Sequence, residues 1–197
     1  FFYLLGILIF FDFGCNESSS DKFVQVSESG LSFKLPRTWK KITGPDLDAY
    51  RQQIQEQSYS QARSLGFPDP EDFKIREFAM FSAAEEEIAA VLALAIKIPS
   101  SLDTSYIEMM YENMSGQIYS RFDKVNVFRI TEIDQTPVLE SDVQGEGGSR
   151  IITYNFWSPT APSQAFLLQV IIAPGHYLEF KPVIDSLRNS IHFNLQK

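Results

Sequence analysis

The chain has very few of the residues on which several classes of protein depend. Among its 197 residues there is one cysteine and there are two histidines. A single cysteine excludes an intramolecular disulfide framework and a zinc site built from cysteines. Basic residues are also scarce, with 17 Lys and Arg against 25 Asp and Glu and a formal net charge of −8. Because nucleic-acid binding needs clustered cations, we expect no nucleic-acid partner.

Signatures of catalysis are missing as well. His176 and His192 are expected at the two ends of one helix, so they do not converge on a metal or on a serine. No Gly-x-Ser-x-Gly motif accompanies either histidine. The glycines of residues 145–148 precede a strand and not a helix, which favours a hairpin turn over a phosphate-binding loop. We therefore predict a protein that is not an enzyme.

Two further clusters have structural explanations. The acidic run at residues 85–87 lacks the spaced oxygen ligands of a calcium loop and is expected to be a solvated turn. Met109, Met110 and Met114 lie on the apolar stripe of an expected helix, where methionine fills a core. The sequence thus predicts no catalytic, cofactor-binding or metal-binding residue, and no cofactor.

An almost unbroken apolar run opens the chain. Residues 1–11 are too few for a comfortable transmembrane span but fit the apolar part of a signal peptide, whose charged start is missing here. The run leads to Gly14 and Cys15 and resembles a bacterial lipoprotein signal, in which a small residue precedes the cysteine that receives the lipid. Asp12 and Phe13 depart from the aliphatic and small residues that such signals prefer.

We predict a signal peptide at residues 1–14, lipidation of Cys15 and a polar tether over residues 15–22. This anchor would hold the protein to a membrane of the bacterial cell envelope, facing the periplasm or exposed at the surface. Two alternatives remain open: an uncleaved membrane anchor, or a buried apolar strand with a free thiol. A lipidated Cys15 would have no free thiol for catalysis.

Hydrophobic periodicity predicts one domain over residues 23–197. The expected strands cover residues 23–26, 31–35, 73–82, 88–98, 125–133, 137–143, 151–157 and 166–173. The expected helices cover residues 46–65, a segment from Ser101 or Asp103 to Phe122, and residues 177–191. Strand pairs joined by tight turns imply a mostly antiparallel sheet covered by helices, an α+β fold.

The faces of the expected strands can be assigned from their alternation. In strand 151–157 the large residues at 152, 154 and 156 share one face, with Thr153 and Asn155 on the other. Strand 166–173 is apolar except at Gln169, as expected for a central strand covered on both faces. Strand 88–98 alternates small and large apolar residues, so a helix can approach its small face closely. The helix 46–65 is polar and should lie lightly packed on the surface.

Two motifs resemble the PsbP-like domain family. Phe33, Pro36 and Trp39 match the F-x-x-P-x-x-W pattern of its opening strand, and residues 180–193 are similar to its closing helix. The resemblance would cover residues 23–193, and it implies an α/β/α sandwich around an antiparallel sheet. The family includes a photosystem II subunit, a Ran-binding nuclear transport factor and many bacterial envelope lipoproteins of unassigned role. The resemblance implies partner binding, because members of the family mostly bind partners rather than catalyse. We also expect Trp39 to be a buried anchor of the core.

Two functions follow as hypotheses from different classes. The first is a lipid-anchored envelope domain that binds or supports a protein partner without catalysis, whether transiently or as a permanent part of a membrane complex. The second is an envelope enzyme or small-ligand-binding protein with a pocket between sheet and helix. A concave pocket with convergent polar groups would favour the second hypothesis, and a filled sandwich would favour the first.

Overall fold

The computed structural model describes residues 23–28, 31–64, 66–67, 71–83, 88–99, 105–157 and 163–193. Cys15, the expected signal and tether, the acidic run 85–87 and the expected helix caps Ser101 and Asp103 lie outside these ranges. Within them, no helix is both long enough and apolar enough to cross a membrane.

The described strands form two sheets in which every pair is antiparallel. The large sheet has seven strands in the order β3-β4-β5-β9-β8-β7-β6, and the small sheet has three in the order β1-β2-β10. The large sheet consists of β3 (Lys40–Lys41), β4 (Ile75–Ser82), β5 (Ala89–Lys97), β6 (Lys124–Ile133), β7 (Thr136–Gln144), β8 (Arg150–Trp157) and β9 (Gln164–Ile172). The small sheet consists of β1 (Phe23–Glu28), β2 (Leu31–Pro36) and β10 (His192–Phe193).

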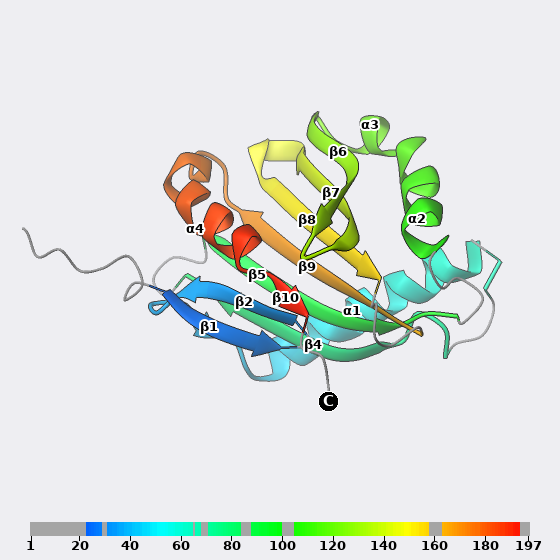
Figure 1. Cartoon of the computed structure of the whole chain (residues 1–197), viewed down its shortest axis with the longest axis horizontal. Coiled ribbons are helices and arrows are strands. Elements are labelled where there is room, and N and C mark those ends of the chain that lie inside the picture. The colour runs from blue at the N-terminus through cyan, green and yellow to red at the C-terminus, as the bar shows by residue number, and fades with distance from the viewer. Residues whose placement is uncertain are drawn as a thin grey trace, which may run out of the picture.

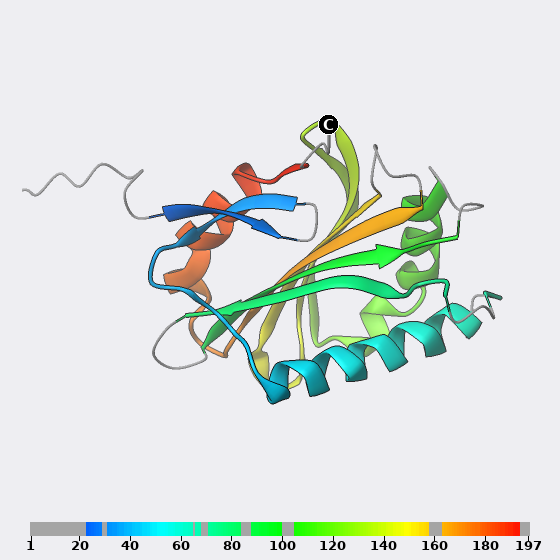
Figure 2. The ribbon, with the colours of Figure 1, turned by 90° about the horizontal axis from the view of Figure 1, so that it is seen from below.

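Both faces of the large sheet are covered, as Figures 1 and 2 show. One face carries α1 (Pro45–Ser64), α2 (Tyr106–Ser115) and the short α3 (Ile118–Arg121). The opposite face carries α4 (Tyr177–Asn189) together with the small sheet. The prediction of a mostly antiparallel sheet between helices is therefore confirmed, and the fold class is α+β.

The two faces of β5 follow the alternation of its sequence. Its small residues, Ala89 and Val91 among them, pack in the core under α4 and the small sheet. The larger Leu92 and Leu94 pack on the other side, against Ile54 of α1. Small side chains let the α4 layer approach the sheet closely, and large ones fill the space under the polar helix α1. The strand prediction for this Ala-rich segment is thus confirmed.

Two expected helices have different bounds in the structure. The segment predicted to run as one helix to Phe122 ends at Ser115, and a separate turn of helix, α3, follows Gly116 and Gln117. Glycine in a helix interior costs about 1 kcal/mol relative to alanine, which makes this the weakest point of the segment. The last helix ends at Asn189, so that His192 and Phe193 are free to pair with β2.

Trp39 is not the buried anchor that the sequence predicts. Its ring is half-buried and contacts Phe180 of α4 edge-on, with ring centroids 6.0 Å apart. Phe33, from the same motif, is fully buried in β2 and lies edge-on to Phe81 of β4, with centroids 6.2 Å apart. Phe33 therefore joins the small sheet to the large one, while Trp39 covers the margin of this contact.

A group of charged side chains links α4 to the large sheet. Asp142 of β7 accepts a 2.7 Å hydrogen bond from Arg150 Nε of β8, and the Arg150 guanidinium lies 3.3 Å from the ring centroid of Tyr177 at the start of α4. The hydrogen bond with Asp142 raises the pKa of Arg150 above its ordinary value. Next to them, Glu140 bonds both Arg129 and Arg188. Sequence reasoning missed these pairs because their members come from separate elements.

Candidate functional site

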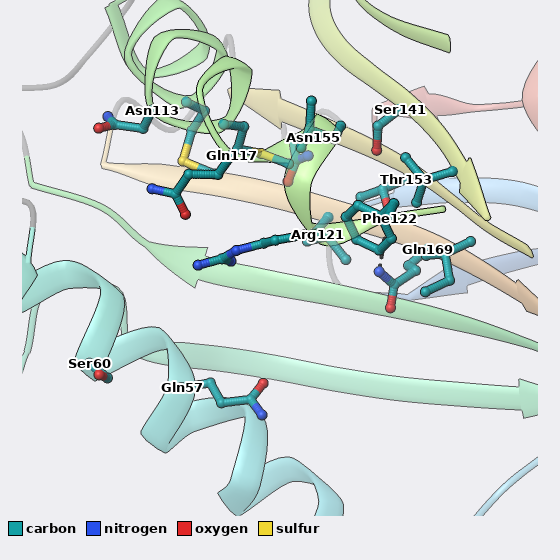
Figure 3. Close-up of a pocket in the computed structure, with 16 residues that line it drawn as sticks. Gln57, Ser60, Asn113, Gln117, Arg121, Phe122, Ser141, Thr153, Asn155 and Gln169 are labelled. Atoms are coloured by element: carbon teal, nitrogen blue, oxygen red, sulfur yellow. Dashed lines mark hydrogen bonds between the residues drawn. The ribbon is translucent and has the colours of Figure 1, made fainter. Parts of the chain in front are cut away.

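A cavity of about 760 Å³ lies between the large sheet and the helices α1, α2 and α3. Its volume is in the range of pockets that hold small molecules. Figure 3 shows α1 on one side of this space, α2 and α3 on the other, and the strands behind them. The sandwich is therefore not filled on this face. A concave pocket between sheet and helices is what the small-ligand hypothesis requires.

The floor of the cavity carries a row of polar side chains. Ser141 of β7 pairs with Thr153 of β8, and Thr153 pairs with Gln169 of β9, so the three lie side by side across the sheet. Gln169 Nε2 donates a 3.2 Å hydrogen bond to Thr153 Oγ1, drawn as a dashed line in Figure 3. Ser141 and Thr153 are both buried. A polar row in the middle of a covered sheet is costly unless something hydrogen-bonds to it.

Asn155 is the most informative residue of the floor. It lies on the same face of β8 as Thr153 but two positions along, between Leu139 and Leu167 of the neighbouring strands. Asn155 is 4% exposed, and it lines the cavity. Its amide therefore offers donors and an acceptor to whatever occupies the cavity.

Helix α1 is positioned over the cavity by polar contacts, because its apolar stripe is sparse. Gln55 Oε1 accepts a 2.7 Å hydrogen bond from the Ile75 backbone N–H, and Gln55 Nε2 and Ser58 Oγ both donate to the Phe73 carbonyl. These bonds fix the rotation of α1 and place Gln57 and Ser60 towards the cavity (Figure 3). The expectation of a polar, lightly packed surface helix agrees with this arrangement.

The opposite wall comes from α2, α3 and the short connection between them. It supplies the carboxamides of Asn113 and Gln117 and the cation Arg121, which extends from α3 over the sheet in Figure 3. Arg121 is exposed to solvent, and it forms no ion pair with any described residue. Met110 and Met114 also line the cavity, and they pack with Met109 against the core as predicted.

A smaller cavity of about 170 Å³ adjoins the first. Asn155, Gln57, Met110 and Leu167 line both spaces, so the two are neighbours. The other residues of the smaller cavity are mostly apolar: Ile54, Ser58, Ala62, Phe73, Leu94, Ile96 and Tyr106. Burial raises the pKa of the Tyr106 phenol, which therefore contributes a hydroxyl and no charge.

The chemistry available in the cavities is hydrogen bonding, apolar contact and one positive charge. Among the described residues that line them, none is a histidine, cysteine, aspartate or glutamate, so no general base adjoins the hydroxyls. The two histidines lie elsewhere. His176 precedes α4 with Nδ1 3.0 Å from Glu179, and His192 lies in β10 with Nδ1 3.3 Å from Asp134. The described residues contain no cluster of three potential metal ligands.

The glycine-rich segment after β7 forms a turn between two strands. Gly145–Gly148 connects β7 to β8, where Gly145 N–H bonds the Ser149 carbonyl at 2.9 Å, and this is the predicted hairpin turn. The lipidation site Cys15 lies outside the described residues. The cavity itself was not located from the sequence, although Gln169, Thr153 and Asn155 gave a signal as polar residues in otherwise apolar strands. The sequence does not show that these residues lie near one another, because that depends on how the strands pair.

Comparison with known proteins gives matches among solved structures alone. No protein-family model matches the chain, and neither does any curated protein. The chain is similar to the solution structure of PsbP (CyanoP) from the cyanobacterium Synechocystis sp. PCC 6803, with 12% identity, a TM-score of 0.48, and coverage of 91% of this chain and 97% of that one.

A second similar structure is a crystal structure of a protein from Bacteroides thetaiotaomicron VPI-5482. The identity is 10%, the TM-score is 0.47, and the match covers 89% of this chain and 49% of that one, so the present chain spans about half of its length. The first of the two structures is a PsbP protein, and both matches have TM-scores below 0.5. At these identities they concern the fold alone.

Proposed function

We propose that this protein is an envelope protein, lipid-anchored at Cys15, whose folded domain binds a small polar ligand in the cavity beneath α1, α2 and α3. The observation that carries the proposal is the buried polar floor of the cavity, above all the amide of Asn155, which lines both cavities. A ligand that hydrogen-bonds this amide and the polar row beside it would be oriented by them. With no acid–base residue among those described around the cavity, we propose binding without catalysis.

The proposal predicts opposite effects of one substitution on stability and on binding. Asn155→Leu replaces the buried amide with an apolar group of similar size, so the free energy of unfolding should be unchanged or raised by about 1–2 kcal/mol. The same variant should lose the ligand. We would purify wild type and variant from the native envelope, denature them, and compare the released small molecules by mass spectrometry.

A matched control is Asn189→Leu, which makes the same chemical change at an exposed position at the end of α4. This control should release the same small molecule as the wild type. Wild-type protein that releases no small molecule, or an Asn155→Leu variant that releases the wild-type compound in equal amount, would contradict the proposed function.

Binding of a protein partner, as the family resemblance implies, is a second candidate. The observation in its favour is an apolar strip beside β6, which is an edge strand of the described sheet. Tyr111 of α2 stacks on Phe128 with ring centroids 4.9 Å apart, and Ile130 follows on the same face of β6. Tyr111 and Ile130 are 36% and 41% exposed. Aromatic side chains of this kind are enriched in protein interfaces.

The proposed anchor is tested at Cys15. In cells that express the protein with a complete signal, Cys15→Ser should move it from the membrane fraction to the soluble fraction without changing its melting curve. The intact mass of the wild type should equal a chain that begins at Cys15 plus acyl groups. A Ser18→Ala variant in the tether should stay on the membrane. Membrane retention of the Cys15→Ser variant would count against lipidation.

A further inference from the structure

We infer that the ligand of the cavity is a small amphipathic acid, with an apolar end in the smaller cavity, a hydrogen-bonding body over the polar row and an anionic group at Arg121. This inference rests on the proposed function and specifies the ligand class of the same site. Three properties of the lining residues lead to it: the sign of their charge, the kind of polar group they offer and the separation of apolar from polar walls.

The charge of the cavity is opposite to that of the whole protein. The chain carries a formal net charge of −8, yet Arg121 is the one charged side chain among the described residues that line the larger cavity. With no ion-pair partner, its guanidinium keeps its donors for a carboxylate or a phosphate, which it can bind in a bidentate manner. A cationic ligand would be repelled by Arg121, and no carboxylate among the described lining residues would offset that repulsion.

The polar groups of the floor and walls favour a body that both donates and accepts hydrogen bonds. Besides its hydroxyls, the larger cavity is lined by five carboxamides, each of which offers both donors and an acceptor. They are Gln57, Asn113, Gln117, Asn155 and Gln169. Asn113 uses one donor for the Met109 carbonyl at 2.8 Å, and Gln169 uses one for Thr153. An amide in the ligand would match the remaining groups, including the buried amide of Asn155.

Asn155 also fixes the orientation of the ligand. It lines both cavities, whereas Arg121 lines only the larger one. A ligand amide held at Asn155 would thus direct an apolar group towards Phe73, Leu94 and Ile96 and an acid group towards Arg121. Burial of even a short alkyl chain against these apolar side chains is favourable, which sets this direction.

The inference is tested with two probes that differ only in charge, N-hexanoylglycine and N-hexanoylglycinamide. We would measure their dissociation constants by calorimetry with the whole folded protein, as wild type, as Arg121→Gln, and as Arg51→Gln. Arg51 lies on an exposed position of α1 and does not line the cavity. We expect the acid to bind the wild type and the Arg51→Gln control at least tenfold more tightly than the amide.

In Arg121→Gln the ratio of the two dissociation constants should fall to about one. Glutamine still offers hydrogen-bond donors at this position, but it carries no charge. Equal binding of the two probes to the wild type, or an acid preference that survives in Arg121→Gln, would overturn the inference and leave the proposed function standing. If neither probe binds, the inference is tested by the small molecule that the wild-type protein from the native envelope releases on denaturation. An amphipathic anion supports the inference, a neutral or cationic compound refutes it, and the absence of any compound refutes the proposed function itself.

Discussion

We expect Phe33→Ala to lower the free energy of unfolding by about 3–5 kcal/mol, the range measured for aromatic-to-alanine changes in well-packed cores. Phe33 has no exposed surface, and it lies in β2, the central strand of the small sheet. Its contact with Phe81 joins the small sheet to β4 of the large one. Removal of the ring therefore leaves a cavity at the joint between two sheets, where few backbone hydrogen bonds could prevent separation.

Thermal and chemical unfolding followed by circular dichroism would measure this effect, and for a chain of this size the melting temperature should fall by roughly 6–20 °C. Two control variants separate the effect of the buried ring from other effects of substitution. Lys34→Ala changes the adjacent, exposed residue of β2 and should stay within about 0.5 kcal/mol of wild type. Trp39→Ala should cost only about 1–3 kcal/mol, because part of its ring is already in water. A larger loss for Trp39→Ala than for Phe33→Ala would contradict this assignment.

Arg150→Ala should have an effect of similar size, about 3–5 kcal/mol, for an electrostatic reason. The side chains of Arg150 and Asp142 are 21% and 12% exposed, so the loss of the guanidinium leaves a largely buried carboxylate without its cation. The substitution also removes the contact of Arg150 with Tyr177, through which α4 begins on the sheet. Asn126, which donates a 3.2 Å hydrogen bond to Asp142, carries no charge to offset the carboxylate.

The electrostatic origin can be separated from simple loss of packing. Arg150→Ala combined with Asp142→Ala removes both charges, and this double variant should be more stable than Arg150→Ala alone. Arg129→Ala is the matched control, because Arg129 is 58% exposed and its partner Glu140 keeps Arg188. We expect that control to lose no more than about 1 kcal/mol. Additive losses in the double variant would refute the electrostatic explanation.

The sequence by itself determined most of the secondary structure and the direction in which its side chains point. Alternation in β2, β5 and β8 assigned Phe33, Ala93 and Phe156 to buried faces, and each is buried in the structure. The apolar stripe of residues 177–191 gave α4, and the polar stretch after Gly44 gave α1. These features are local, since the spacing of apolar residues along an element already fixes which side of it leaves water.

Long-range packing decided the rest. Ser141, Thr153 and Gln169 become one polar row only through the registers of β7, β8 and β9. Periodicity within a single strand assigns its residues to faces but does not identify the residue that lies opposite on the next strand. The local pattern predicted the strands that form β1 and β2, but the pairing of β10 with β2 joins distant parts of the chain, and no local pattern marked it. Arg121 lines the cavity from α3, a separate turn of helix after Gly116 and Gln117 that the continuous apolar stripe did not predict. The elements were thus set by local periodicity, while the candidate site was set by contacts between elements, because each of its walls comes from a different segment of the chain.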